Sequence, residues 1–548
     1  MQKSGWVLLL GSLLGLTSCG GGGSSQTTPT TPVPPVAQSG SYTVTAWSEL
    51  GMHCMDGKDY SVFAVLPPYN SLHAQVIKRG DPPVLASDVT VTYQATADTA
   101  GSSNTSSASK TNFWTYVQAL FGVNPLPDTG LTGSLVQSNT PQAMTYNATS
   151  GAWDAVGIPT VPFDDAGNRN PYPMGKIVVK DSAGNVIAST TAVLAVSDEL
   201  TCSVCHASAS NPAAQPGTGW ENNPDLAKDT RLNILKKHDD RWDVSSYLAA
   251  LKTKGYSYQA SLYQTAKGGT PVLCAACHAT NALGAAGMTG VNALTADMHT
   301  LHGPLINPAT GVSLDNATSP EGSCYLCHPG LQTKCQRGAM NKVACFNCHG
   351  NLTRVGVVGR QGWIDLPSCQ MCHNGGTRAT TTLDTTGAWR VTTDTTFATN
   401  PNKPATGKSL YKVSTGHGGL YCAACHGSQH AEYPTLQAND NIYSNGLQGY
   451  TGKIVECTVC HGTMPSTQAG GPHGMHTIGQ NWVSQHRQFA GNGGSSQCTY
   501  CHGADFRGTA LSAIPTTRTL SAGDSGTKTF SAGHQMNCYD CHNGPGGG

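Results

Sequence analysis

The chain has 548 residues, of which 38% are hydrophobic and 11% charged, and its 31 basic side chains balance 31 acidic ones. This length allows two or more domains, and the zero net charge gives no electrostatic reason to expect nucleic-acid binding. The 21 Cys and 20 His are the unusual part of the composition. Over this length the cysteines are too sparse for a small disulfide-rich scaffold.

Residues 1–18 have the pattern of an export signal. Lys3 precedes a short apolar run from Trp6 to Leu16, which is too short to cross a bilayer. The run ends in Leu-Thr-Ser-Cys at 16–19, which resembles the lipobox of bacterial lipoproteins and implies that Cys19 carries a lipid. Residues 19–40 then predict a flexible Gly/Ser/Thr/Pro tether. An ordinary signal peptide with an unmodified Cys19 is the alternative.

Residues 41–198 predict a small β-sandwich-like domain. Apolar and polar residues alternate in short runs at 41–47, 88–93 and 176–180, with the β-branched residues typical of half-buried strands. The last run meets a turn cluster at 181–185 and continues through 186–193, which is the signature of a hairpin. From residue 199 the chain is irregular and Gly-rich, so we place a domain boundary between 198 and 199.

From residue 202 onward, the pattern Cys-x-x-Cys-His occurs nine times. The composition of the chain predicts about 0.03 matches by chance. Eighteen cysteines belong to the pattern: Cys202, Cys205, Cys274, Cys277, Cys324, Cys327, Cys345, Cys348, Cys369, Cys372, Cys422, Cys425, Cys457, Cys460, Cys498, Cys501, Cys538 and Cys541. Each second cysteine is followed directly by a histidine: His206, His278, His328, His349, His373, His426, His461, His502 and His542.

This spacing is the one that covalent haem attachment requires. Two thiols three positions apart add to the two vinyl groups of one haem, and the adjacent imidazole binds the iron. Zinc is the alternative, but zinc sites pair two Cys-x-x-Cys halves and do not require a His after every second Cys. We therefore predict nine haem c cofactors. With about 39 residues for each haem, the haems take the place of a conventional core, and loops and short helices wrap around them.

Residues 199–548 resemble the multihaem c-type cytochromes, and more narrowly the large lipoprotein cytochromes of dissimilatory metal-reducing bacteria. Segments 422–434 and 471–479 are similar to stretches common in that group. Segments 47–56 and 66–70 are similar to the haem-free N-terminal domain of some members. The resemblance implies an outer-membrane lipoprotein, on the cell surface or the periplasmic face. It would carry respiratory electrons between other c-type cytochromes, outer-membrane conduit proteins and extracellular acceptors such as metal oxides.

Eleven histidines lie outside the motifs, and nine of them fall within 199–548. Nine spare histidines for nine haems predict that most irons bind a second, distal imidazole, which keeps the haem potential lower than a Met ligand does. The distal candidates are His238, His299, His302, His417, His430, His473, His476, His486 and His534. We expect one or two of them to be ordinary surface residues. Alternative ligands are Met298, Met340, Met464, Met475 and Met536.

Spacing suggests how some distal histidines are shared out. His299 and His302 are three apart in a helix-compatible stretch, so both side chains can point the same way. His473 and His476 repeat this spacing, and we predict that each pair serves two neighbouring haems. His417 lies too close to the motif that follows it to bind that motif's iron easily. We expect it, and likewise His534, to reach a neighbouring haem.

Two cysteines remain after Cys19 and the motif cysteines are assigned: Cys54 and Cys335. We predict a disulfide between them. One alternative is an enlarged haem motif in which Cys335 replaces Cys345. Another is a copper site near Cys54 built from His53, Met55 and His73. His53 or His73 binding a haem at the domain boundary is also open.

The leading functional prediction is an electron carrier with no catalytic residue of its own. A second hypothesis is an oxidoreductase that reduces a small nitrogen or sulfur oxyanion at one haem with an open distal position. The altered attachment motif, such as Cys-x-x-Cys-Lys, that often marks such a haem is absent from the sequence. A third hypothesis is a subunit of a conductive filament in which neighbouring subunits donate iron ligands.

Overall fold

The structure is a computed structural model that describes residues 40–136, 138–242, 248, 252, 260–374, 377–397, 412, 414–466, 470–490 and 495–545. The predicted signal segment, the lipidated Cys19 and the predicted tether up to residue 39 lie outside these residues. Within the described ranges, no helix has both the length and the apolar composition that a membrane span requires.

Two antiparallel sheets form the N-terminal part of the structure. The first contains β1 (Tyr42–Ser48), β4 (Tyr69–Lys78), β9 (Ala152–Pro159) and β8 (Thr145–Asn147) in that order, with β5 (Val84–Leu85) paired to β4. The second has the order β11 (Val186–Val193), β10 (Met174–Lys180), β6 (Thr90–Thr96) and β7 (Gln142–Ala143). Helix α1 (Phe113–Phe121) lies between β6 and β7 in the chain.

The two sheets share one hydrophobic core. Val44 and Leu72 of the first sheet and Tyr93 and Ile177 of the second belong to the same buried cluster. Period-two alternation explains this, because every second side chain of a strand faces the same side of its sheet. The hairpin predicted at 176–193 is confirmed: β10 and β11 pair antiparallel, with Lys180 opposite Val186.

Short helices and irregular chain form the motif region, residues 199–545. The helices are α2 (Ser203–His206), α3 (Leu226–Arg241), α5 (Leu262–Lys267), α6 (Leu294–His302), α7 (Cys345–His349), α8 (Leu352–Val355), α9 (Cys422–His426), α10 (Ala438–Gln448), α11 (Gln480–Phe489) and α12 (Ser495–His502). Two hairpins, β14 (His373–Asn374) with β15 (Thr377–Arg378) and β16 (Arg518–Ser521) with β17 (Thr527–Phe530), complete it.

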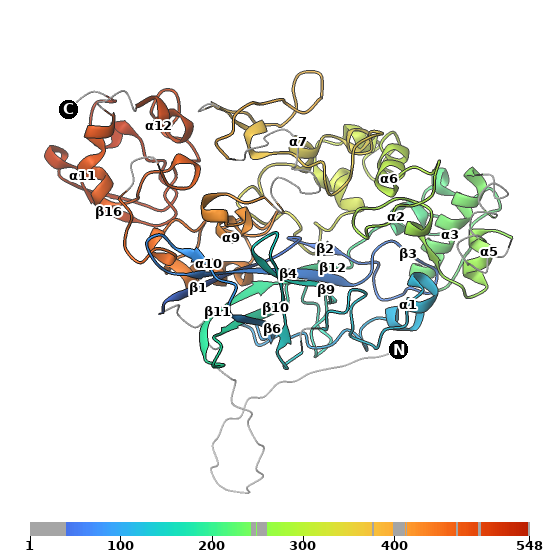
Figure 1. Cartoon of the computed structure of the whole chain (residues 1–548). Helices are drawn as coiled ribbons and strands as arrows, with labels where there is room; N and C mark the ends of the chain where they lie inside the picture. Colours follow the sequence, from blue (N-terminus) through green and yellow to red (C-terminus); the bar gives the residue numbers. More distant parts are fainter. Residues whose placement is uncertain are drawn as a thin grey trace, which may run out of the picture.

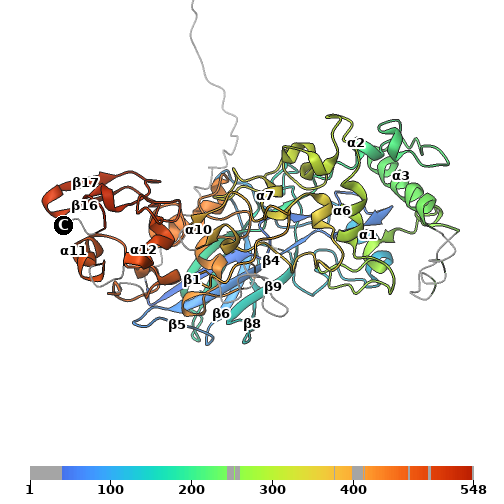
Figure 2. The same cartoon turned by 90° about the horizontal axis from the view of Figure 1, so that it is seen from above.

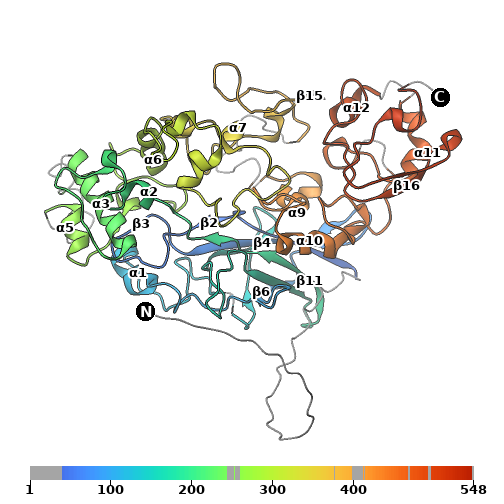
Figure 3. The ribbon, with the colours of Figure 1, turned by 180° about the vertical axis from the view of Figure 1, so that it is seen from behind.

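The motif region extends along one side of the two sheets. In Figure 1 it runs from α3 and α5 at one end, through α6 and α7, to α11 and α12 at the other end. The views from above and from behind show the same order (Figures 2 and 3). The sheets therefore act as a base along which the nine motifs are laid out in an extended series.

The β region and the motif region are joined across the predicted boundary at residue 198. Strand β13 (Val272–Leu273) of the motif region pairs in parallel with β3 (Phe63–Ala64) of the β region. Strand β12 (Val196–Ser197), directly before the boundary, pairs in parallel with β2 (His53–Cys54) inside the β region. The side chain of Gln75 donates to Gly419 O and accepts from Tyr421 N. The β13–β3 pairing fixes the segment before the second motif to the β region, and Gln75 fixes the segment before the sixth motif to β4.

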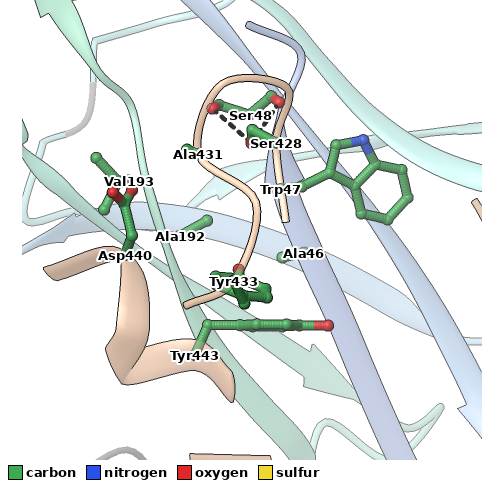
Figure 4. Close-up of a pocket in the computed structure, with 10 residues that line it drawn as sticks. All are labelled: Ala46, Trp47, Ser48, Ala192, Val193, Ser428, Ala431, Tyr433, Asp440 and Tyr443. Carbon is green, nitrogen blue, oxygen red and sulfur yellow. Dashed lines mark hydrogen bonds between the residues drawn. The ribbon is translucent and has the colours of Figure 1, made fainter. Parts of the chain in front are cut away.

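A small pocket marks another part of this junction (Figure 4). The Ser48 and Ser428 hydroxyls lie 3.1 Å apart, and Ser428 also donates to Ser48 O at 2.9 Å. Below them the rings of Tyr433 and Tyr443 stack with centroids 5.5 Å apart. The loop after the sixth motif is thus held against β1 by hydrogen bonds and against α10 by aromatic packing.

A buried carboxylate in the β region predicts a pH effect on stability. Asp56 is 4% exposed and accepts from Val65 N at 2.6 Å. Burial raises its pKa to about 6. The folded protein therefore keeps a proton on Asp56 between about pH 4 and pH 6 that the unfolded chain has lost, so stability falls as the pH rises through this window, by about 3 kcal/mol.

The variant Asp56→Asn is expected to lose this fall in stability, because the amide keeps an oxygen acceptor but does not ionise. Denaturant unfolding of the wild type and the variant between pH 4 and pH 7 measures the difference. Asp59→Asn is the matched control. Burial alone would raise the pKa of Asp59, but hydrogen bonds from Asn112 and Ser61 lower it. This variant should therefore retain the fall in stability between pH 4 and pH 6. Parallel pH profiles for wild type and Asp56→Asn would contradict the assignment.

Candidate functional site

All nine motifs adopt one short helical turn. In the first, α2 begins after Cys202; in the others, a turn of α or 3-10 helix contains the first cysteine. In several motifs the histidine N–H donates to the carbonyl of the first cysteine, as in His206 to Cys202 at 2.8 Å and His328 to Cys324 at 2.8 Å. Residues three apart lie on one side of such a turn. The turn thus brings both thiols of a motif to one side.

Eight motif histidines lie beside a second histidine. The ring centroids are 6.3 Å apart for His206 and His302, 6.4 Å for His278 and His238, 6.1 Å for His328 and His299, 6.1 Å for His349 and His430, 6.1 Å for His426 and His473, 6.1 Å for His461 and His417, 6.3 Å for His502 and His476, and 6.0 Å for His542 and His486.

This separation fits one metal atom between two rings. Imidazole nitrogen binds a first-row metal at about 2 Å, so two imidazoles on opposite sides of one iron have centroids about 6 Å apart. Packed rings can also lie at this separation, as Trp47 and His73 do at 6.0 Å, so it is the repeated pairing of a motif histidine with a second histidine that indicates a shared metal. The residues present therefore fit a six-coordinate haem at each of the eight pairs.

Hydrogen bonds orient many of these rings. The Nδ1 atom of eight paired histidines lies 2.7–3.4 Å from a backbone carbonyl oxygen, as in His299 to Thr295 O and His502 to Met536 O, both at 2.7 Å. The other six are His278, His302, His473, His476, His486 and His542. A proton on Nδ1 leaves the lone pair on Nε2 for a metal.

Burial keeps several of the paired imidazoles neutral. It lowers the pKa of His349 to about 3. It lowers the pKa to about 4 for five others: His206, His299, His426, His430 and His476. Neutral imidazole is the form that binds iron, so these positions are prepared for metal binding at neutral pH.

The two closely spaced pairs each reach two different motifs. On α6, His299 faces the third motif and His302 the first. His473 faces the sixth motif and His476 the eighth. His417 lies beside His461 of the seventh motif rather than beside the sixth motif that follows it. None of these partners could be assigned from the sequence.

The structure does not bring His534 beside a motif histidine within the described residues. Its Nε2 atom lies 2.9 Å from Asp540 Oδ2, and its ring packs on Phe530 at 5.0 Å. Its own neighbouring motif supplies the carboxylate, so local contacts occupy the ring. His373 of the fifth motif is correspondingly the one motif histidine of the described chain without an imidazole at this separation. Phe397 lies beside it instead, which nothing in the sequence pattern indicated.

The remaining candidates lie in or near the β region. His53 Nε2 is 3.0 Å from Pro67 O, and His73 Nδ1 is 2.7 Å from Asp154 Oδ1. The described residues hold no group of three or more His, Cys, Asp or Glu side chains arranged to bind a metal. Cys54 and Cys335 are free thiols. Burial raises the pKa of Cys54, and the nearby Cys335 adds to this rise. The disulfide between them stays a prediction.

Comparison with known proteins adds no relative: no family model, no curated protein and no solved structure matches the chain.

Proposed function

We propose that the chain is an electron-transfer protein that binds nine haem c groups and carries respiratory electrons along them at the outer membrane, toward extracellular acceptors such as metal oxides. The observation that carries the proposal is the set of eight histidine pairs with centroids 6.0–6.4 Å apart, each containing one motif histidine. Haem c supplies reversible one-electron chemistry when it is bound.

The side chains of the protein would hold each haem in place and orient the imidazoles that bind its iron. Paired cysteines on one helical turn would anchor each cofactor, and two neutral imidazoles would keep its potential low. Carbonyl groups that accept from Nδ1–H fix the ring orientations and raise the basicity of the ligating nitrogen.

The closeness of several motifs to one another supports a series of neighbouring cofactors. The thiols of Cys324 in the third motif and Cys345 in the fourth are close enough for Cys345 to lower the pKa of Cys324. In five further pairs, burial raises the pKa of the first thiol and the second thiol is close enough to add to this rise. These pairs are Cys327 and Cys202, Cys348 and Cys372, Cys369 and Cys422, Cys425 and Cys460, Cys538 and Cys498. Together these pairs place motifs 1, 3, 4, 5, 6 and 7 next to one another in that order, and motif 8 next to motif 9. The segment from His473 to His476 links the sixth motif to the eighth.

The proposal includes a lipid on Cys19 as the membrane anchor, with other c-type cytochromes and outer-membrane conduit proteins as partners. Its test is haem content, reduction and location of the purified, mature protein. We expect nine haems per chain in the pyridine haemochrome assay, reoxidation of the reduced protein by a soluble or mineral Fe(III) acceptor, and recovery in outer-membrane fractions. A chain that binds zinc, or no haem, would overturn the proposal.

Removal of one distal histidine should open one site. His302→Ala is expected to convert one haem from low spin to high spin, because His302 is the imidazole beside His206. Low-temperature EPR of the oxidised protein with haem quantification measures the change. His534→Gln is the matched control and should leave the spectrum unaltered. An unchanged spectrum for His302→Ala would refute the pairing.

A further inference from the structure

The fifth motif differs from the other eight. Its histidine, His373, faces the ring of Phe397, with centroids 6.3 Å apart and planes inclined by 61°. That distance falls within the range of the eight histidine pairs, so the phenyl ring occupies the separation at which a distal imidazole is found elsewhere. A phenyl ring has no lone pair to donate to a metal.

No histidine is left to serve this motif. All 20 His of the chain are in the described residues. Sixteen form the eight pairs, and His53 and His73 bond to Pro67 O and Asp154. His534 has its Nε2 atom on Asp540. His373 is the remaining one.

Basic side chains lie near His373. Arg378 lies directly opposite His373 in the β14–β15 hairpin, where facing side chains are neighbours. Burial lowers the pKa of His373, and the positive charges of Arg378 and Lys453 lower it further. Burial raises the pKa of the neighbouring Cys372 thiol, and Arg390 and Arg378 oppose this rise. A negatively charged ligand would be attracted here.

We propose that the haem attached at Cys369 and Cys372, whose iron His373 would bind, has no histidine ligand at its sixth position, and that a small inorganic anion binds there by displacing the Phe397 ring that shields it. This inference rests on the proposed function, because it requires a haem at the fifth motif. It makes this motif the one ligand-binding site in a series of sites otherwise closed by two imidazoles.

The site is adjacent to the rest of the series. Phe397 also packs on His473, with centroids 5.1 Å apart, and His473 pairs with His426 of the sixth motif. Through Phe397 the anion site therefore borders the distal ligand of the next motif. A bound anion would lie beside the chain of cofactors rather than at its end.

EPR and azide binding on the full haem-loaded protein test the proposal. We expect eight low-spin haems and one high-spin haem, and azide binding that saturates at one per chain and removes the high-spin signal. Phe397→His should convert the high-spin haem to low spin and abolish azide binding. Phe397→Leu, which also lacks a lone pair, should retain both. Arg378→Gln should weaken azide about threefold to tenfold, whereas Lys180→Gln on β10 should not.

The other outcomes each overturn a defined statement. Nine low-spin haems would overturn the open site, and a high-spin haem that appears on His534→Gln would then identify His534 as the ligand. A high-spin haem that disappears on self-association, and persists in His534→Gln, would assign a ligand from a second copy of the chain. A high-spin haem unaffected by Phe397→His would place the open site at another motif. Fewer than nine haems would overturn the proposed function itself.

Discussion

Replacing Arg337 by alanine is expected to lower the free energy of unfolding by about 3–5 kcal/mol. The guanidinium is 1% exposed and donates to both carboxylate oxygens of Asp440, at 2.6 and 3.0 Å, and to Gly51 O. It also lies 5.0 Å from the centre of the Tyr172 ring. Removal of the arginine leaves the Asp440 carboxylate buried without its counter-charge, and this unpaired charge is the source of the cost.

The position of Arg337 explains why the effect should be global. Gly51 belongs to the β region and Asp440 to α10, so one side chain joins the sheets to the segment that follows the sixth motif. In addition, a Cβ atom on Gly51 would collide with the carbonyl of Gln429, which shows how closely the two parts approach. Loss of the arginine therefore loosens the interface between the base and the motif series.

Guanidinium chloride unfolding followed by far-UV circular dichroism, at equal haem content, measures this change. Arg169→Ala is the matched control, because Arg169 forms a more exposed ion pair with Asp198 at 2.7 Å and should cost less than about 1 kcal/mol. If both variants lose less than that amount, the buried pair does not hold the two regions together.

A chain produced without haem is expected to keep the two sheets and to lose the fold of much of the motif region. The largest hydrophobic cluster lies wholly between Val44 and Leu194. Near the C-terminus, by contrast, the buried residues of the local cluster are Ile514, Leu520 and Phe530. Such a small cluster cannot offset the conformational entropy of the chain around it, and covalently bound haems would supply the missing apolar surface.

Hydrogen exchange of the haem-free and haem-loaded proteins tests this expectation. Amides of β4, β9 and β10 should keep their protection without haem, whereas those of α11 and α12 should exchange about two orders of magnitude faster. Each protein contains both regions, so the sheets serve as the internal control. Equal protection of α11 and α12 in the two samples would show that the motif region has an adequate core of its own.

Local chemistry was readable from the sequence. The nine motifs and the 176–193 hairpin depend on residues a few positions apart, so spacing alone predicts them; the structure confirms the hairpin and gives each motif a helical turn. The correspondence of nine motifs with nine spare histidines was also visible in the sequence. In the structure eight of the spare histidines lie beside a motif histidine, whereas the ninth, His534, bonds a carboxylate of the adjacent motif, which no count of residue types could reveal.

The sequence by itself predicts where haem would attach and that most irons would have a second imidazole, because a thiol pair and its histidine act within one helical turn. Only the tertiary structure decided which histidine meets which motif, that Phe397 and not an imidazole faces His373, and that Arg337 joins the sheets to α10. The partners in these contacts are distant in the chain, and packing of the motif region against the two sheets brings them together.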